Sequence, residues 1–210
     1  MAVAAVVGQK GGVGKSTLSR LIAREAAAAG WAVVVADLDM QQLSTLRWAE
    51  RRAVAGIKPM IDVMNADSAA AAIALAQGAA VDLVVVDAPA RASAATLDLA
   101  RAADVVLQPA SPSLDDLRPA VVLYQELVRA GISREKLAVV LTSTETAAEE
   151  RDARSYVEQA GFVVLPGSIP HRPLYRQAQN GGKTLSEVGP VSLRKRVRQV
   201  AEAIAARLQG

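Results

Sequence analysis

The sequence predicts an α/β fold, in which a doubly wound, mostly parallel sheet is flanked by helices. Short apolar runs alternate with alanine-rich helical segments along the 210 residues. Hydrophobic residues make up 51% of the chain but aromatic residues only 3%, so Ala, Val, Leu and Ile must form the core. Such a composition is typical of helices packed on a buried parallel sheet.

The expected strands are short apolar runs, most of them bounded by glycine, proline or aspartate. Pro59 places one of them at an edge of the sheet, because proline cannot donate a ladder hydrogen bond. Another is expected to end at Pro109, and the last leads into a turn. In chain order the predicted strands span residues 2–8, 31–37, 57–63, 81–87, 103–109, 136–143 and 162–170.

The expected helices lie between these strands and carry apolar residues at helical spacing. Gly30 and Gly161 follow two of them and are typical helix stops. Pro119 is compatible with a helix only in its first turn. The predicted helices span residues 15–29, 42–55, 68–77, 115–130, 147–160 and 191–208. The sequence shows no repeat or linker, so we expect one domain over residues 1–210 that ends in a basic helix at about 191–208.

Composition and charge limit the possible functions. The chain contains no cysteine, which excludes disulfides and thiolate metal sites. No apolar run reaches the length of a membrane span, so we expect a cytoplasmic protein. The net charge is +3, but residues 190–210 hold five basic side chains and only one acidic one. This concentration of positive charge predicts a polyanionic partner.

The segment QKGGVGKST at residues 9–17 lies between the first expected strand and the first expected helix. Gly11, Gly12 and Gly14 leave room for backbone N–H groups to surround phosphate oxygens. The start of the helix adds its positive end at the same place. Lys15 can then reach the β- and γ-phosphates of a nucleotide. The segment therefore predicts a phosphate-binding loop.

The neighbours of the glycines refine this prediction. The Ser16 hydroxyl is the expected ligand of Mg²⁺. Thr17 stands where a dinucleotide fingerprint requires its third glycine, so that alternative is excluded. Gln9 stands where the common G-x-x-x-x-G-K-[ST] loop has its first glycine, and the glycines that follow still supply the cradle.

Two of the expected strands end in aspartate. Asp87 closes the run VDLVVVD, which fits a Walker B strand, and we expect it to hold Mg²⁺ through a water molecule. Asp37 closes the run WAVVVAD, with Asp39 two residues later. In parallel sheets, ligands bind at the carboxyl ends of the strands, where both acids lie. The alternative for Asp37 and Asp39 is a structural role in a turn or at a helix start.

The segment KGGVGKST resembles the deviant Walker A loop of the ParA/MinD family of ATPases. The resemblance implies that Lys10 reaches across a dimer interface to the phosphates bound by the partner subunit, while Lys15 contacts the phosphates of its own subunit. A cation held in this way stabilises the dimer only when nucleotide is present. The alternative for Lys10 is a solvated loop residue.

Two further segments carry the resemblance. Residues 33–42, VVVADLDMQQ, are similar to the D-x-D-P-Q segment of the family, with Met40 in place of the proline. Residues 87–90, DAPA, resemble its D-x-P-P segment. The match implies that Asp37 helps to organise the metal region and that Asp39 orients or activates the attacking water.

The later part of the chain resembles the family more faintly. Residues 107–117 resemble a loop near the dimer interface, and we assign no chemistry to Asp115 and Asp116 because acids are ordinary in a first helical turn. Residues 168–182 resemble a loop that borders the adenine, and His171 within it is expected at the surface. The predicted nucleotide contacts are Lys10, Gly11, Gly12, Val13, Gly14, Lys15, Ser16, Thr17, Thr142 and Pro170.

Arg194, Lys195 and Arg198 lie away from the apolar face of the last expected helix. Three interpretations are open: a docking helix with a solvated basic face, a nonspecific DNA-binding surface, and a membrane-surface helix. The apolar face lacks Phe and Trp, which interfacial helices usually carry, so DNA is favoured over a membrane. No helix-turn-helix precedes the phosphate loop, which disfavours recognition of a specific DNA sequence.

The resemblance implies a small ParA-type ATPase that uses ATP and Mg²⁺ and forms a homodimer around two ATP molecules. The ATP dimer would bind nonspecific DNA, and a ParB-like or other adaptor would stimulate hydrolysis and release it, moving a plasmid, chromosome or other cargo. Such a protein would be nucleoid-associated. The alternatives are a MinD-like membrane-associated ATPase or scaffold, and a metabolic kinase or synthetase, for which the sequence shows no second substrate pocket.

Overall fold

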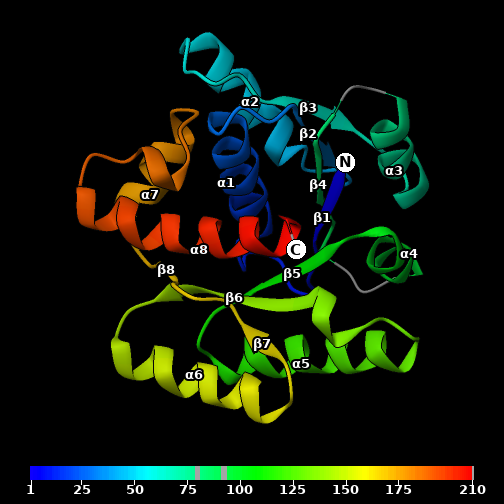
Figure 1. The fold of residues 1–210 in the computed structure, drawn as a ribbon. Helices are drawn as coiled ribbons and strands as arrows, with labels where there is room; N and C mark the ends of the chain where they lie inside the picture. Colours follow the sequence, from blue (N-terminus) through cyan, green and yellow to red (C-terminus); the bar gives the residue numbers. More distant parts are fainter. Residues whose placement is uncertain (79–80, 91–93, 210) are drawn as a thin grey trace.

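The computed structural model describes residues 1–78, 81–90 and 94–209, and it contains one parallel sheet of eight strands (Figure 1). The strand order is β3-β2-β4-β1-β5-β6-β7, and β8 also pairs with β6. The predicted fold class is confirmed. The strands are β1 (Ala2–Val6), β2 (Val33–Asp37), β3 (Asp62–Asn65), β4 (Leu83–Asp87), β5 (Val105–Ala110), β6 (Leu137–Thr144), β7 (Val163–Val164) and β8 (Ile169–Pro170).

Helices cover both faces of this sheet (Figure 1). One face packs against α3, α4, α5 and α6, and the other against α1, α2, α7 and α8. The helices are α1 (Lys15–Ala28), α2 (Ser44–Val54), α3 (Ala69–Gly78), α4 (Ala94–Ala102), α5 (Leu114–Arg129), α6 (Ala147–Gln159), α7 (Pro173–Asn180) and α8 (Val191–Gln209), with 3₁₀ turns η1 (Arg134–Lys136) and η2 (Leu185–Glu187).

The central strands are buried on both faces because their side chains alternate between two apolar layers. In β4, Val84 and Val86 contribute to the layer under α3 to α6, whereas Leu83 and Val85 contribute to the layer under α1 and α8. Both layers consist largely of Ala, Val, Leu and Ile, as the composition predicts.

Two predicted strands differ from the structure. β3 does occupy the predicted edge of the sheet, but it begins only at Asp62. The segment before it is a loop against α2, where Arg52 Nε donates to the Pro59 carbonyl at 2.8 Å. The run predicted at 162–170 is divided into β7 and β8. Between them Gly167 has a φ of 80°, and Arg154 satisfies the Leu165 and Gly167 carbonyls at 2.9 and 2.7 Å.

Prolines account for two other differences. Pro109 does not end β5, which continues to Ala110. At that point β5 pairs only with β6, because the ladder with β1 stops at Leu107. Pro119 lies beyond the first turn of α5, because that helix begins at Leu114 after a cap in which the Ser113 hydroxyl accepts from an N–H at 3.2 Å.

The sequence analysis also missed two helices. α4 is the next element after β4 and buries Leu99 and Ala100. α7 begins with Pro173 in its first turn, where proline is favoured, and buries Tyr175. It is only eight residues long, too short to give a clear periodic pattern.

Candidate functional site

The loop between β1 and α1 has the geometry of an anion cradle. Gly12 and Gly14 have φ values of 79° and 100°, which L side chains rarely adopt. Gly14 is the N-cap of α1 and no side chain caps this helix start. The first N–H groups of the helix are therefore available to an anion, as the sequence predicts.

A cavity of about 270 Å³ lies against this loop. Its walls come from the glycines and the start of α1, from the loop after β2, and from Ala88 and Ala90 after β4. The fold thus brings together Lys15, Ser16 and Asp39, three of the residues predicted for phosphate chemistry.

A second cavity, of about 300 Å³, lies on the other side of the loop and shares Gly12, Gly14 and Thr17 with the first. Thr142 and Pro170, the two predicted base contacts, both line it. The Thr142 hydroxyl also donates to the Val13 carbonyl at 3.0 Å and so holds the loop in place. The two cavities together have the arrangement expected for a phosphate chain and a base, although the role of each contact remains a prediction.

Lys15 is 8% exposed, and its Nζ donates to the Lys10 carbonyl at 2.6 Å. Burial lowers the pKa of Lys15, whereas the negative charges of Asp87 and Asp39 act to raise it. In the part of the chain that the structure describes, Lys15 forms no salt bridge. Its ammonium group is therefore placed to pair with an anion in the phosphate cavity.

Asp37 and Asp87 are register partners at the carboxyl ends of β2 and β4. Both oxygens of Asp37 are occupied, because Oδ1 accepts from the Asp39 N–H at 3.1 Å and Oδ2 from the Thr45 N–H at 3.0 Å. Asp37 is buried and does not line the phosphate cavity. Its contacts hold the loop that carries Asp39, so any part in the metal region would be indirect.

Asp87 is also buried, and its Oδ2 accepts from the Thr45 hydroxyl at 2.7 Å. Its Oδ1 has no hydrogen-bond partner among the described residues. Burial raises the pKa of Asp87 to about 6. The side-chain hydrogen bonds from Thr45 and Ser16 oppose this rise, and the charge of Asp37 adds to it.

This donor set fits Mg²⁺. The described residues include no cluster of three acidic or histidine side chains that could hold a metal alone. Mg²⁺ is usually held by one or two carboxylates together with phosphate oxygens and water, so a single unpartnered oxygen on Asp87 suits it. The Ser16 hydroxyl accepts from Ser44 Oγ at 3.0 Å at the wall of the phosphate cavity. Ser16 and Asp87 would hold the ion, which would neutralise phosphate charge.

Replacing Asp87 by asparagine is expected to stabilise the ligand-free protein by roughly 2–3 kcal/mol above pH 6, since the carboxyl group ionises near pH 6 when folded and near pH 4 when unfolded. The ionised, buried carboxylate thus destabilises the fold at neutral pH. At pH 4.5 the gain should shrink to about a third, because the folded carboxyl is then protonated. Thermal unfolding at both pH values measures this.

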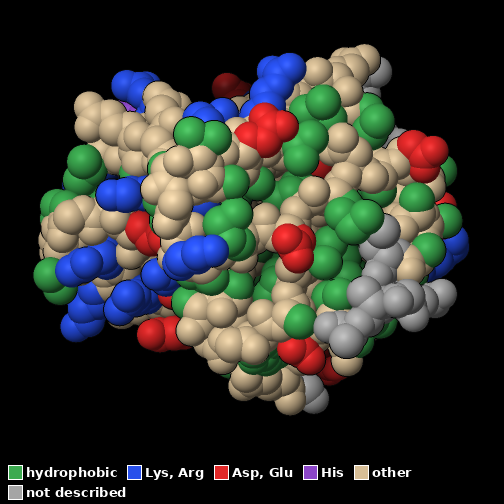
Figure 2. All heavy atoms as spheres, turned by 90° about the horizontal axis from the view of Figure 1, so that it is seen from above, with side chains coloured by type: hydrophobic (Ala, Val, Ile, Leu, Met, Phe, Trp, Pro, Cys, Tyr) green, Lys and Arg blue, Asp and Glu red, His purple; other side chains and the backbone are tan. Residues whose placement is uncertain are grey.

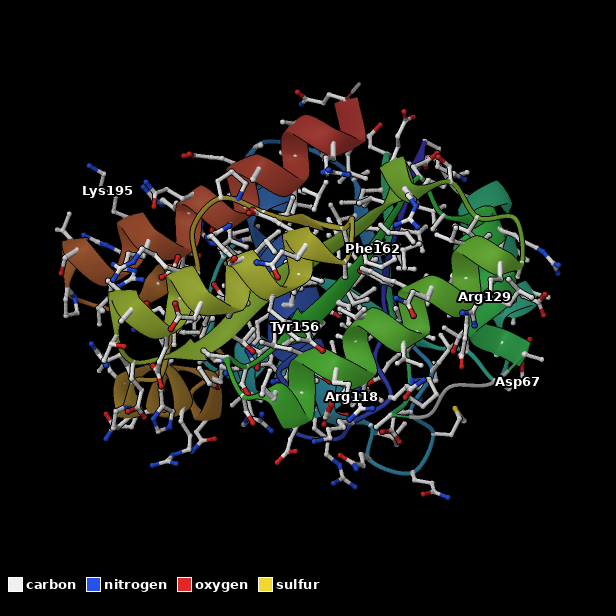
Figure 3. All side chains as sticks on the ribbon, turned by 90° about the horizontal axis from the view of Figure 1, so that it is seen from below. Asp67, Arg118, Arg129, Tyr156, Phe162 and Lys195 are labelled. Atoms are coloured by element: carbon white, nitrogen blue, oxygen red, sulfur yellow. The ribbon has the colours of Figure 1, made fainter. Side chains whose placement is uncertain are left out.

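The matched control for this prediction is Asp67→Asn, because Asp67 is exposed and does not line the phosphate cavity (Figure 3). We expect it to change stability by less than about 0.5 kcal/mol at either pH. An Asp87→Asn protein that is no more stable than the wild type at pH 7.5 would contradict the destabilising role of the carboxylate.

Asp39 lies at the wall of the phosphate cavity. Its Oδ1 accepts from the N–H groups of Gln41 and Gln42 at 3.3 and 3.0 Å, so Asp39 does support a turn. Its Oδ2 accepts no hydrogen bond within the described ranges and remains available to a water molecule. Both interpretations of this aspartate are therefore compatible with the structure.

Lys10 is directed away from its own phosphate cavity. Its side chain is 44% exposed, and its Nζ donates to Asp116 Oδ1 at 2.9 Å. Burial acts to raise the pKa of Asp116, but hydrogen bonds from Ser111 and Lys10 outweigh it and lower the pKa. Asp116, to which we assigned no chemistry, is thus the cis partner of Lys10. Only the fold reveals this contact, because the two residues are 106 positions apart.

Other polar contacts at the site also escaped the sequence analysis. Arg20 donates to the Thr45 hydroxyl at 3.3 Å and to Gln179 Oε1 at 3.0 Å, and Thr17 donates to the same oxygen at 3.1 Å. Thr45 lies six residues after Asp39, in the first turn of α2, and could have been suspected from that position. Nothing in the sequence indicates Gln179. His171 is exposed, as expected, and lies 3.5 Å from a carboxylate oxygen of Glu145.

The residues predicted for DNA binding lie on α8. Lys195 and Arg198 are exposed and Arg194 is half-buried. On the opposite side of the same helix, Val197, Val200 and Ile204 are buried in the layer shared with α1. The apolar face of α8 is therefore used for packing, while Lys195 and Arg198 remain exposed.

Comparison with known proteins finds one family model that matches most of the chain. The family model described as the CobQ/CobB/MinD/ParA nucleotide binding domain matches residues 4–185. None of the curated proteins searched matches the sequence.

Among solved structures, the septum site-determining protein MinD of Pyrococcus horikoshii OT3, complexed with Mg-ADP, has a TM-score of 0.77 at 15% identity. The match covers 97% of this chain and 95% of that one. A ParA family ATPase from Chlorobium tepidum TLS has a TM-score of 0.71 at 18% identity, with coverages of 97% and 98%. A putative plasmid partition protein from Borrelia burgdorferi B31, bound to AMPPNP, has a TM-score of 0.75 at 14% identity, with coverages of 98% and 99%.

At these identities the solved structures show a shared fold. The family model covers most of the chain, including the glycine loop and both strands that end in aspartate. The chain therefore belongs to the CobQ/CobB/MinD/ParA nucleotide-binding domain family.

Proposed function

We propose that the protein is an ATPase of the partitioning or positioning type, whose active site is completed by a second subunit. The observation that carries this proposal is the position of Lys10. Its ammonium group lies outside the phosphate cavity of its own subunit and is held at the surface by Asp116. From there Lys10 would contact a phosphate bound by a partner subunit, while Lys15 would contact the phosphates bound by its own subunit.

ATP with Mg²⁺ is the ligand that this site suits best. The glycine loop and Lys15 supply positive potential for a phosphate chain, and Asp87 leaves one oxygen for the ion. Two proteins of similar fold were solved with Mg-ADP and with AMPPNP. Asp39 would orient the attacking water from the loop after β2, and the backbone N–H groups of the loop would stabilise charge on the phosphates.

The basic face of α8 supports nonspecific DNA as the partner of the ATP dimer. Figure 2 shows Lys and Arg side chains gathered on the side of the molecule formed by α7 and α8. Lys195 projects from α8 into open space (Figure 3), and Arg198 is also exposed. Dimerisation would double these contacts and so make DNA binding depend on ATP.

A membrane partner has less support, because the apolar side of α8 is buried against the core. In the part of the chain that the structure describes, no helix is both long and apolar enough to cross a membrane. An adaptor that stimulates hydrolysis and releases the dimer from DNA completes the proposal. A nucleoid-associated protein of this kind would move a plasmid, a chromosome region or another large cargo.

Gel shift with a duplex of random sequence tests the DNA proposal. We expect binding with ATP and not with ADP, and a salt slope near −4 per subunit if about four phosphates are contacted. Replacing both Lys195 and Arg198 by glutamate should abolish binding, while Arg129→Glu on α5 should not (Figure 3). Flotation with anionic liposomes runs in parallel. ATP-dependent flotation without a gel shift would reject DNA in favour of a membrane.

A further inference from the structure

Arginines from α1 and α2 converge on an open cavity of about 450 Å³ beside the phosphate cavity. Arg47 and Arg51 are four positions apart on α2, so they share one face of that helix. No acidic side chain lines the cavity. Its walls are formed by Arg20, Gln41, Gln42, Ser44, Arg47 and Arg51.

Arg20 and Arg52 are the two buried arginines among the residues that the structure describes. Arg52 forms a salt bridge with Glu187. Arg20, Arg47 and Arg51 form none with any residue that the structure describes. Like charges four residues apart destabilise a helix, so α2 is less stable for carrying this pair. An anion bound in the cavity would offset the repulsion between Arg47 and Arg51.

Arg20 forms the inner part of the cavity. It is only 8% exposed, with Nε and Nη1 bonded to Thr45 and Gln179. Its Nη2 donates to no group within residues 1–78, 81–90 and 94–209. Burial lowers the pKa of Arg20 to about 10, and the charge of Arg51 acts in the same direction, against Asp87 and Asp37. Arg20 lines the phosphate cavity too, so the two cavities are contiguous.

We propose that this cavity is a second anion site, in which Arg20, Arg47 and Arg51 bind the carboxylates of an acidic segment of a partner protein. The guanidinium fork matches a carboxylate in a bidentate manner. The amides of Gln41 and Gln42 and the Ser44 hydroxyl add neutral donors around the charge. The site shares no residue with the basic face of α8.

Geometry favours a flexible acidic chain over duplex DNA. The phosphates of a duplex lie along two fixed ridges, so they can contact exposed side chains such as Arg47 and Arg51. Because these ridges are rigid, they are less suited to reach Arg20, which is only 8% exposed. An Asp or Glu side chain on an extended segment can do so, because each carboxylate moves independently of the next.

A fluorescein-labelled hexaglutamate peptide tests the site by fluorescence anisotropy, at roughly 0.15 M salt so that long-range attraction is screened. The wild type is compared with an Arg47→Gln/Arg51→Gln variant. We expect its affinity to fall at least about tenfold, the effect of losing one charged hydrogen bond or more. Both positions are exposed, and circular dichroism and ATP binding confirm that the variant is folded.

The matched control is Arg129→Gln/Arg151→Gln, which removes the same charge from exposed sites on α5 and α6. Its affinity for the peptide should stay within about twofold of the wild type. Equal losses in the two variants, or no binding by the wild type, would overturn the proposal. So would an equal loss of duplex DNA binding by the Arg47/Arg51 variant, which would assign these arginines to a DNA surface. A wild type that binds the peptide but no DNA leaves the proposal intact and rejects only the DNA function.

Discussion

Replacing Lys10 by alanine is expected to leave ATP binding nearly unchanged and to abolish ATP-dependent dimerisation. Lys10 does not line the cavity of its own subunit, so the cis contacts of Lys15 and the glycine loop survive the change. In a symmetric dimer the substitution removes two contacts between a lysine and a phosphate. Each is worth at least about 2 kcal/mol when desolvated, so the dimer should weaken by about a thousandfold or more.

The ion pair between Lys10 and Asp116 does not prevent Lys10 from moving to the phosphates bound by the partner subunit. The lysine side chain is 44% exposed, and exposed ion pairs contribute only about 0–1 kcal/mol. A triphosphate carries more charge than one carboxylate and would compete successfully for Lys10. The Asp116 contact therefore holds the lysine near the surface without fixing it there.

Sedimentation velocity with ATP and with ADP measures the effect, alongside binding of a fluorescent ATP analogue. Lys183→Ala is the control, since Lys183 is an exposed lysine outside both nucleotide cavities. It should dimerise like the wild type. An intact ATP dimer of the Lys10→Ala variant would falsify the role of Lys10 across the interface.

Asp39→Ala is expected to bind ATP and dimerise, yet to hydrolyse ATP about 10²–10⁴-fold more slowly, the usual contribution of a group that activates a water. Asp39 lines the phosphate cavity and its Oδ2 is not used by the described residues. The loss should fall on kcat, with little change in the affinity for ATP.

Asp39 also supports a turn, so a control variant must keep the turn while it removes the charge. Asp39→Asn keeps an oxygen that can accept from Gln41 and Gln42, so the loop should stay folded while the negative charge is lost. If the charge orients the water, both variants hydrolyse slowly. If Asp39 acts only through the turn, the asparagine variant retains the rate, and the assignment to the water is wrong. Phosphate release at saturating ATP distinguishes these results.

Local chemistry explains which features the sequence could reveal. The glycine loop, Lys15 and Asp87 were predictable because each belongs to a contiguous pattern of strand, loop and helix. The pairing of Lys10 with Asp116 was not, because it depends on where α5 begins relative to β1. Gln179 reaches Thr17 only because α7 packs beside the start of α1. Such contacts are set by topology, which residue spacing alone does not encode.

Errors in the predicted elements have the same origin. Arg52 and Arg154 donate hydrogen bonds to backbone carbonyls in two segments that the apolar pattern predicts to be continuous strands. Because the arginines satisfy these carbonyls, the segments can form loops. Pro119 was expected only in a first turn because the interior of a helix disfavours proline, yet α5 continues through it.

The position of β1 in the sheet determines when the loop can form during synthesis. β1 precedes in the chain both of its neighbours in the sheet, β4 at Leu83–Asp87 and β5, which pairs with it through Leu107. β1 must therefore stay unpaired until β4 has been made, and it gains its second neighbour only with β5. Non-local pairing of this kind slows folding and leaves an apolar segment exposed for longer. The nascent chain would thus be most vulnerable to aggregation before β5 emerges.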